Sequence, residues 1–242
     1  MRKVVRFGMI LAVLSSGVCV LAVGQNSSGG SREMSVEESY RQESVENMII
    51  REQSRADSME MKLIALEYIR DAIDRGNKGP EIQSALEYLA MEGIINIIRE
   101  DNRVINNYPP IRVKAAEYLG DMGTPEAKNL LIRLVRTDKE PMVLQEAIKS
   151  LGRIATNDGN EIINVISGVV IRRNNLNQPD NLLAFSALEV YDKIAKANGG
   201  LQDPIVVQTV INIAEGNYSP TVRNRAKQVL VNLREYASSG KE

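Results

Sequence analysis

The chain has 242 residues, of which 43% are hydrophobic and only 4% aromatic, so its core must consist mainly of aliphatic side chains, which suit packed helices better than a β-sandwich. It has no histidine, which excludes Ser-His-Asp triads and histidine-containing zinc sites. The 30 basic and 31 acidic side chains give a net charge of −1, which does not suit a protein that binds a polyanion such as nucleic acid.

Residues 1–24 predict an export signal. A start with three basic residues precedes an apolar run over residues 7–14, and Ala-Val-Gly at 22–24 has the small-x-small pattern of a cleavage site. We expect cleavage before Gln25. Cleavage there would remove the only cysteine, Cys19, and leave a mature chain with neither a disulfide nor a thiol nucleophile.

Two alternatives remain open for this segment. The stretch from Phe7 to Val23 is nearly long enough to span a membrane as an uncleaved anchor. The residues that end at Cys19 partly match a lipoprotein box, which would attach a lipid to that cysteine. All three readings place the rest of the chain outside the cytoplasm, in the periplasm or in the extracellular space and cell envelope. A membrane contact is expected only with the anchor or the lipid.

The segment after the signal is short and polar. Residues 25–34 have nothing to bury and predict a flexible tether. A first helix is expected over residues 35–54, because Ser35 and Glu38 have the spacing of a capping box and an apolar stripe follows them. This helix would cap the domain that follows it.

Residues 57–236 predict a domain of internal repeats, followed by a disordered tail over 237–242. Five segments share one pattern, each centred on an alanine: Ala85, Ala115, Ala147, Ala187 and Ala226. Their intervals of 30, 32, 40 and 39 residues fit one helical hairpin per repeat. Each alanine-centred helix is expected to be the second of its hairpin, after first helices over 57–75, 93–104, 125–136, 161–172 and 204–215. No run of strand alternation is convincing, so the fold class is all-α, an α-solenoid of about five hairpins.

The second of these segments resembles the second helix of a HEAT repeat, especially the variety also found in bilin lyases. The resemblance is carried by Pro109-Pro110-Ile111-Arg112, Ala115-Ala116 and Leu119-Gly120, and the start at Ser219 is similar. It extends over residues 57–236 and implies a HEAT-like superhelix. It also implies an alternative function, a lyase-like enzyme or a carrier of small ligands on the same fold.

HEAT repeats usually align an Asp in the turn within a repeat with an Arg that opens the second helix. Asp101 and Asp138 match the Asp position, and Arg112 and Arg223 match the Arg position. In the other three repeats the Arg position is occupied by Gln83, Leu144 and Ala184. The resemblance therefore does not imply a continuous Asp–Arg ladder.

Three constellations could carry chemistry, and each also has a structural interpretation, which we favour. The carboxylates Glu117 and Asp121, and likewise Glu189 and Asp192, share a helix face that lysines could neutralise. The arginines that end first helices interact favourably with the helix dipole and need not form an anion-binding ridge: Arg99, Arg136 and Arg172. The tyrosines at one repeat position, Tyr88 and Tyr118, are expected at the helix seam and not in a surface stripe.

No phosphate loop, nucleophile elbow or Cys-x-x-Cys motif is present, so we predict no catalytic residue, no cofactor and no metal site. A solenoid instead offers a long surface for a protein partner on its second helices. Counting 100° per residue from the central alanines selects the outward positions. Among them, the residues predicted to bind the partner are Val113, Glu117, Lys149, Arg153, Phe185 and Glu189, with Val113 and Phe185 as exposed apolar anchors.

Overall fold

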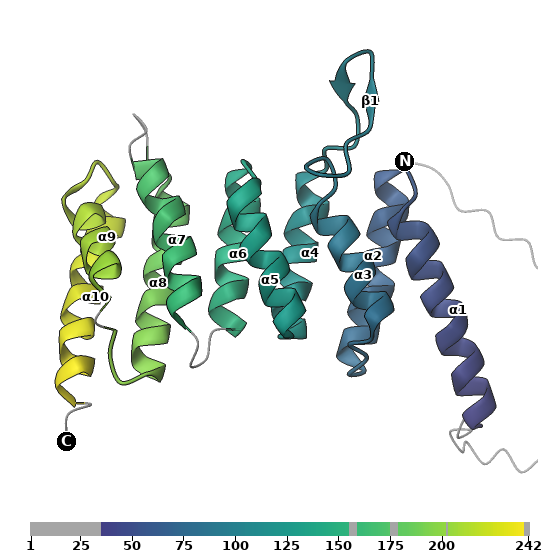
Figure 1. The fold of residues 1–242 in the computed structure, drawn as a ribbon, viewed down its shortest axis with the longest axis horizontal. Coiled ribbons are helices and arrows are strands. Elements are labelled where there is room, and N and C mark those ends of the chain that lie inside the picture. The colour runs from purple at the N-terminus through teal and green to yellow at the C-terminus, as the bar shows by residue number, and fades with distance from the viewer. Residues whose placement is uncertain (1–34, 155–158, 175–178, 202, 240–242) are drawn as a thin grey trace, which may run out of the picture.

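The computed structural model describes residues 35–154, 159–174, 179–201 and 203–239, and the predicted signal and tether lie outside these ranges. Within them the chain forms ten α-helices and one small β-hairpin, arranged as an elongated row (Figure 1). The all-α solenoid predicted from the sequence is therefore confirmed. None of the described helices combines the length and the hydropathy that a membrane crossing needs.

The helices follow one another with short connections. Their bounds are α1 Val36–Ser54, α2 Met59–Asp74, α3 Pro80–Ala90, α4 Pro109–Met122, α5 Pro125–Thr137, α6 Pro141–Ile154, α7 Gly159–Asn174, α8 Asn181–Ala197, α9 Pro204–Glu215 and α10 Pro220–Ser239. The two strands, β1 Arg99–Glu100 and β2 Arg103–Val104, pair antiparallel between α3 and α4. Because α10 continues to Ser239, the prediction of a disordered tail is wrong for residues 237–239.

The helices begin where the sequence provides a cap. The Ser35 hydroxyl accepts a hydrogen bond from the Glu38 N–H, and the Glu38 carboxylate accepts one from the Ser35 N–H, so the predicted capping box is present. Thr124 and Asp203 cap α5 and α9 directly before a proline at the first helical position. These local signals explain why the predicted bounds of α5 and α9 agree closely with the structure.

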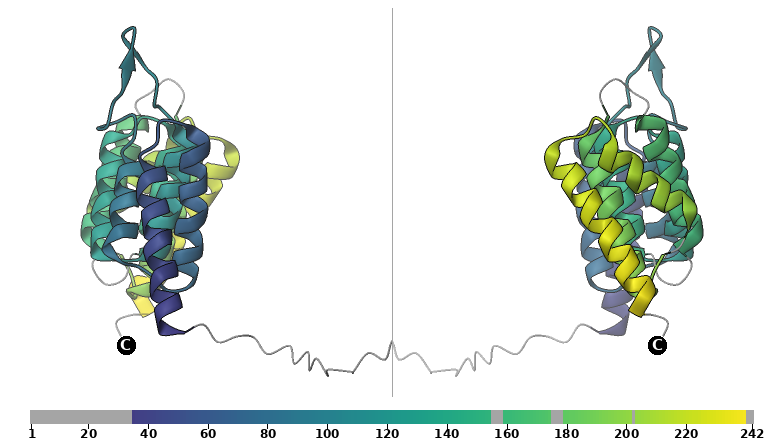
Figure 2. Two further views of the ribbon diagram at one scale, coloured as in Figure 1. Left: turned by 90° about the vertical axis from the view of Figure 1, so that its right-hand side faces the viewer. Right: turned by 90° about the vertical axis from the view of Figure 1, so that its left-hand side faces the viewer.

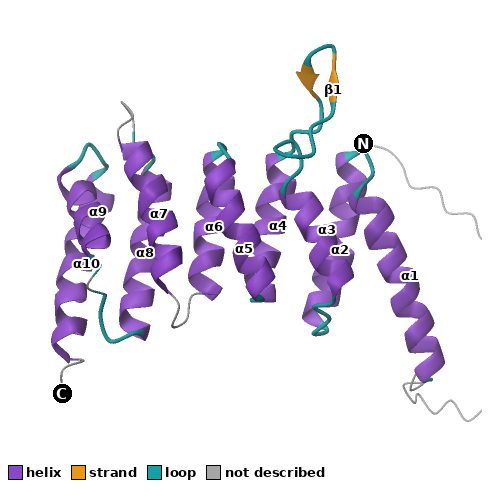
Figure 3. Cartoon of the chain, viewed as in Figure 1, coloured by secondary structure: helices purple, strands orange, loops and turns teal. Residues whose placement is uncertain are grey.

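The helices form two layers. Each odd-numbered helix packs against the even-numbered helix that follows it, which gives five hairpins from α1/α2 to α9/α10. The even-numbered helices lie side by side in one layer and the odd-numbered helices in the other, as the end views of Figure 2 show. The helices alternate in direction along the row, so all even-numbered helices run the same way (Figure 3).

The structure corrects the predicted pairing in the first two repeats. α3, which contains Ala85, lies in the odd-numbered layer between α1 and α5 and is the first helix of the second hairpin. The second helix of the first hairpin is α2, and its fully buried Ala65 is the central alanine. The prediction failed because α3 also begins with a proline and has a central alanine, and neither feature identifies the layer.

The helix expected over residues 93–104 does not exist. This segment forms an arm, a β-hairpin that projects beyond the ends of the helices (Figures 1 and 3). Asp101 and Asn102 occupy its turn with φ of 46° and 65°, values that favour a tight hairpin turn. Gly93 at the base has φ of 71°, and a Cβ there would lie 2.8 Å from the Asn106 carbonyl oxygen, so the base requires glycine.

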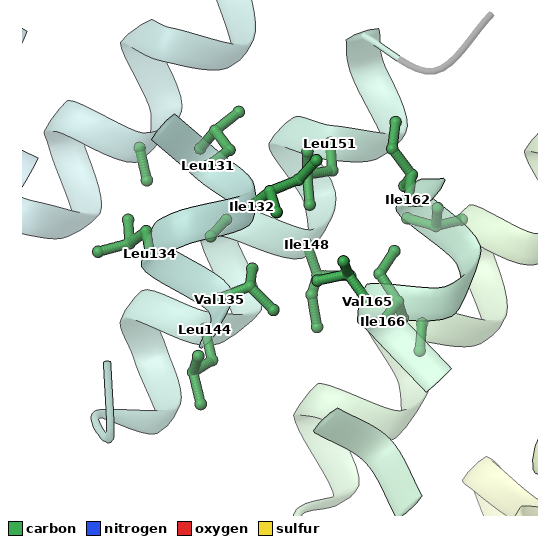
Figure 4. Packing of buried hydrophobic residues seen from close by; sticks show 14 of the residues in the cluster. Leu131, Ile132, Leu134, Val135, Leu144, Ile148, Leu151, Ile162, Val165 and Ile166 are labelled. Carbon is green, nitrogen blue, oxygen red and sulfur yellow. The ribbon is translucent and has the colours of Figure 1, made fainter. Parts of the chain in front are cut away.

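Aliphatic side chains fill the space between the layers. The central alanines of α4, α6, α8 and α10 are fully buried, which lets these helices approach closely. Figure 4 shows the core where α5, α6 and α7 meet, with the labelled side chains Leu131, Ile132, Leu134, Val135, Leu144, Ile148, Leu151, Ile162, Val165 and Ile166. Each such buried side chain contributes about 1.5–3 kcal/mol to stability relative to exposure.

Two buried ion pairs join successive hairpins. Arg112 of α4 donates to Asp138 in the α5–α6 turn, with Nε 2.8 Å from Oδ2 and both side chains 2% exposed. Lys62 has the same position in α2, three residues before the central alanine, and its Nζ lies 2.9 Å from Oε1 of Glu92 after α3. Burial raises the pKa of the Glu92 carboxyl, and Lys62 opposes this shift. The Asp–Arg feature of HEAT repeats is therefore present once, at Asp138 and Arg112, and the Glu92–Lys62 pair forms a second buried rung of the same kind.

The other residues considered for the ladder do not form rungs. Asp101 is exposed at the turn of the arm, and Arg223 is exposed on α10. Leu144 and Ala184 fill the corresponding positions of α6 and α8 with buried apolar side chains. Gln83 belongs to the odd-numbered layer and does not have the equivalent position.

Candidate functional site

Ion pairs join the first three helices of the even-numbered layer. Asp121 of α4 accepts a hydrogen bond from Arg70 of α2, with Nη1 2.6 Å from Oδ2, and its Oδ1 lies 3.4 Å from Nε of Arg153 on α6. Arg153 also donates to the main-chain oxygen of Glu117 and to Oγ of Ser150. Asp121 therefore links α2, α4 and α6.

A second group of polar contacts joins α8 and α10. Arg225 of α10 contacts Glu189 and lies with Nη2 2.7 Å from Oδ2 of Asp192, which also accepts a hydrogen bond from Asn232. These two carboxylates, considered above as a candidate acidic pair, thus bind an arginine of the neighbouring helix and not the lysines of their own helix. Their role in the structure is to hold two helices together.

Among the described residues, no ion pair joins α6 and α8. The two helices instead border an open groove of about 460 Å³. Its charged lining consists of Lys149 and Arg153 from α6 and of Glu189, Asp192, Lys193 and Lys196 from α8. The series of ionic links along the layer is therefore interrupted at this one seam, and the charged side chains there face an open groove.

Close packing forms the floor of the groove. Gly152 of α6 and Val190 of α8 both line it, and a Cβ at Gly152 would lie only 2.6 Å from Cγ2 of Val190. The helices can approach this closely only because residue 152 has no side chain. A rigid floor with charged walls suits a ligand that binds along the surface.

The charge of the groove is basic where it is accessible. Lys193 and Lys196 are exposed and form no hydrogen bond or ion pair with another described residue. Lys149 lies 3.7 Å from Glu146 of its own helix. Because Arg225 already binds the two carboxylates of the groove, the uncompensated groups are ammonium ions, which favour acidic side chains of a partner.

Apolar side chains are exposed near the beginning of the same two helices. Met142 and Leu182 each stand five residues before the central alanine of their helix and are 53% and 65% exposed. Phe185 follows one turn after Leu182 and is 36% exposed. Exposed apolar side chains next to charged ones are typical of protein-binding surfaces.

Four of the six residues predicted to bind a partner are exposed on this part of the surface. Lys149, Arg153 and Glu189 line the groove, and Phe185 lies one helical turn before Glu189. Val113 is different, because it is half-buried and packs against the core. The prediction of an exposed anchor there is wrong, because the Val113 side chain packs against the buried hydrophobic cluster.

Glu117 is likewise half-buried. Its main-chain oxygen, not its carboxylate, forms the contact with α6. The groove also contains two lysines that were not among the six selected residues, Lys193 and Lys196. Lys196 lies one turn after Asp192. Its spacing from Lys193 on one helix face was the signal that could have identified it.

The remaining candidates have structural positions. Arg99 lies in β1 and does not end a helix, so the alternative of an anion-binding ridge of arginines lacks its first member. Tyr118 is 7% exposed with the Arg70 guanidinium 5.4 Å from its ring centroid, and half-buried Tyr88 lies 5.4 Å from Nζ of Lys62. Burial raises the pKa of both hydroxyls. The predicted packing at the helix seams is confirmed, and the two rings lie in different layers.

The described residues contain no group of three His, Cys, Asp or Glu side chains that could hold a metal ion. A strongly raised pKa belongs to Tyr191, which is fully buried with its hydroxyl 2.7 Å from that of Ser167. A core tyrosine of this kind has no access to a substrate. The chemistry that the surface offers is charge, hydrogen bonding and apolar contact.

The fold defines a helical-repeat solenoid, and the comparison with known families agrees. Residues 102–162, from the turn of the arm through α4, α5 and α6 into α7, match the family model of HEAT repeats. The match confirms the resemblance seen at Pro109–Gly120. HEAT repeats commonly mediate protein interactions and are generally non-enzymatic scaffolds. No curated protein matched the chain.

Proposed function

We propose that the protein is an exported, non-catalytic scaffold that binds a protein partner at the groove between α6 and α8. The observation that carries the proposal is the interruption of interhelical ion pairs at this seam, next to uncompensated lysines. Met142, Leu182 and Phe185 supply apolar contacts at the beginning of the same helices. A partner segment with acidic and apolar side chains would match both features.

Export is the second part of the proposal and is supported by the composition of residues 1–24 alone. The basic start, the apolar run and the small residues at 22 and 24 support cleavage before Gln25. Amino-terminal sequencing of the secreted protein should begin at Gln25. A sequence that begins at Met1, or a lipid on Cys19, would replace cleavage with one of the two anchored forms.

Affinity capture of the native protein, followed by quantitative mass spectrometry, tests the binding site. The double variant K193E/K196E should lose the partner that the wild type recovers, because it reverses the charge of the groove. R103E/R136E makes the same change of charge on the arm and on α5 and should recover the partner fully. If both variants recover it equally, the binding site is not the groove.

Phe185→Ala separates binding from folding. The side chain is 36% exposed, so its truncation should cost less than the about 3–5 kcal/mol of a fully buried phenylalanine, and the variant should stay folded. Loss of an interface anchor should weaken binding by more than about 1 kcal/mol. A variant that unfolds without a separate loss of affinity would show that Phe185 belongs to the core.

A further inference from the structure

One position of the even-numbered helices contacts the next helix throughout the layer. It lies five residues after the central alanine. In α2 this residue is Arg70, which binds Asp121 of α4, and in α8 it is Asp192, which binds Arg225 of α10. In α4 and α6 it is Gly120 and Gly152, where a Cβ would lie 2.8 Å from Ser150 and 2.6 Å from Val190 of the next helix.

On α10, no helix of the described residues occupies the next place in the even-numbered layer. The position five residues after its central alanine is occupied by Val231, an apolar side chain that is 54% exposed. Lys227 and Arg234 lie about one turn before and after it and are exposed, without a hydrogen bond or ion pair to another described residue. The carboxyl-terminal end of the layer is therefore an apolar residue between two basic ones.

Other positions contact the preceding helix, namely those one residue before and three and six residues after the central alanine. Arg225 lies one residue before its alanine and binds Asp192. Ser150 and Val190 lie three residues after theirs and face Gly120 and Gly152. Asp121 lies six residues after its alanine and binds Arg70. On α2, the first even-numbered helix of the described residues, these positions are Ile64, Tyr68 and Asp71. Ile64 and Tyr68 are half-buried, and Asp71 is exposed.

The two ends also carry opposite charge. α10 has four basic residues and one acidic residue, and of the basic ones only Arg225 is bound within the described residues, to Glu189 and Asp192 of α8. α2 has four acidic residues and two basic ones, and both basic side chains are already bound, Lys62 to Glu92 and Arg70 to Asp121. Glu67 and Asp71 are exposed at the end of the layer where α2 lies.

We propose that a second copy of this chain occupies this position, so that α10 of one molecule packs against α2 of the next and continues the even-numbered layer. Val231 would contact Ile64 and Tyr68 of the next copy, and Lys227 and Arg234 would pair with its Glu67 and Asp71. The odd-numbered layer adds exposed apolar side chains at both ends, Val45 on α1 and Val207 on α9.

The contact is heterologous, because it joins two different surfaces of the same protein. Each added copy leaves one end of each kind unoccupied, so association continues until a ring closes or an open chain forms. The groove between α6 and α8 does not include these residues and would recur once per copy. The association is therefore independent of partner binding.

Light scattering coupled to size exclusion tests the proposal on the full secreted chain. The mass should rise with protein concentration at about 50 mM salt, and association should weaken about tenfold at about 500 mM salt, because exposed charges are screened. K227E/R234E and E67K/D71K should each be monomeric. An equimolar mixture of the two variants should associate again, since each contact between one variant and the other joins opposite charges.

R103E/R136E is the control for charge and should associate like the wild type. Circular dichroism should show that all variants are folded, because the changed side chains are exposed. The proposal is overturned if the wild type stays monomeric up to about 1 mM, where weak contacts become populated. It is also overturned if the two variants associate like the wild type or if mixing them restores nothing.

Discussion

The guanidinium of the buried Arg112 forms hydrogen bonds with three other residues of the chain. It donates to Asp138, to Oδ1 of Asn107 and to the main-chain oxygen of Glu92. A buried ion pair adds little net stability compared with apolar residues of the same size, but removal of one partner leaves the other as an isolated buried charge. The rungs therefore fix the relative position of hairpins more than they add free energy.

Arg112→Ala should lower the free energy of unfolding by about 3–5 kcal/mol, because it leaves the Asp138 carboxylate buried without its cation. Urea denaturation followed by circular dichroism measures the change. Arg223→Ala is the matched control, since Arg223 has the same position on α10 but is exposed, and it should change stability by less than about 0.5 kcal/mol. Equal effects would show that burial of the rung is unimportant.

Ionisation of Tyr218 should lower the free energy of unfolding at alkaline pH. Burial raises its pKa to about 12, with the Asp180 charge adding to the shift. In the unfolded chain a tyrosine ionises near pH 10, so between about pH 10 and pH 12 the unfolded form loses a proton that the folded form keeps. The contribution is fully present below about pH 10 and is lost as the pH rises through this window.

Tyr218→Phe should therefore reduce the slope of unfolding free energy against pH between about 10 and 12, by up to about 1.4 kcal/mol per pH unit. Chemical denaturation at a series of alkaline pH values measures the slope. A wild-type slope identical to that of Y218F would contradict the shift.

At the scale of elements, the contact between α6 and α8 depends on one missing side chain. Gly152→Ala places a Cβ against the branched side chain of Val190, and overpacking of this kind costs about 1–3 kcal/mol, part of which the better helix propensity of alanine offsets. G152A/V190A should recover part of the loss in a double-mutant cycle. Gly168→Ala is the control, because a Cβ there meets only Arg172 at 3.6 Å, an ordinary contact, and it should stabilise α7.

Most helices could be predicted from the sequence because their signals are local. Pro125 and Pro204 with their preceding caps define the starts of α5 and α9. The arm was missed because the isoleucines of residues 94–98 fit a helical stripe as well as a strand. The Asp101-Asn102 dipeptide, which tolerates positive φ at both turn positions, was the signal that could have identified the hairpin.

The site could be predicted only in part, because exposure depends on neighbours as well as on the angle around one helix. Lys149, Arg153 and Glu189 were selected by angle and do line the groove. Val113 has the same position relative to its central alanine as the exposed Phe185, but its side chain packs against the hydrophobic core and is half-buried. The layer to which α3 belongs also depends on long-range packing, and the alanine pattern does not contain that information.

At the scale of the whole molecule, the links between hairpins are distributed unevenly. Both buried rungs lie within the first three hairpins, and Asp121 joins α2, α4 and α6 on the surface. At the seam between α6 and α8 the described residues form a groove without an ion pair. Solenoids depend on nearest-neighbour interfaces, so uneven interfaces should give uneven local stability.

Native-state hydrogen exchange should therefore show slower exchange in α4, α5 and α6 than in α9 and α10, with opening free energies that differ by about 1–3 kcal/mol. Within the described residues the α9/α10 hairpin has a neighbouring hairpin on one side only, and its rung position is the exposed Arg223. Arg112→Ala should accelerate exchange in α4 to α6 and leave α9 and α10 nearly unchanged, because the rung acts between adjacent hairpins. Uniform protection along the chain, or acceleration of all helices together by R112A, would show that the solenoid opens as one cooperative unit. Exchange measured at low and at high protein concentration separates this gradient from end-to-end association, which would protect α10 and α2 only at high concentration.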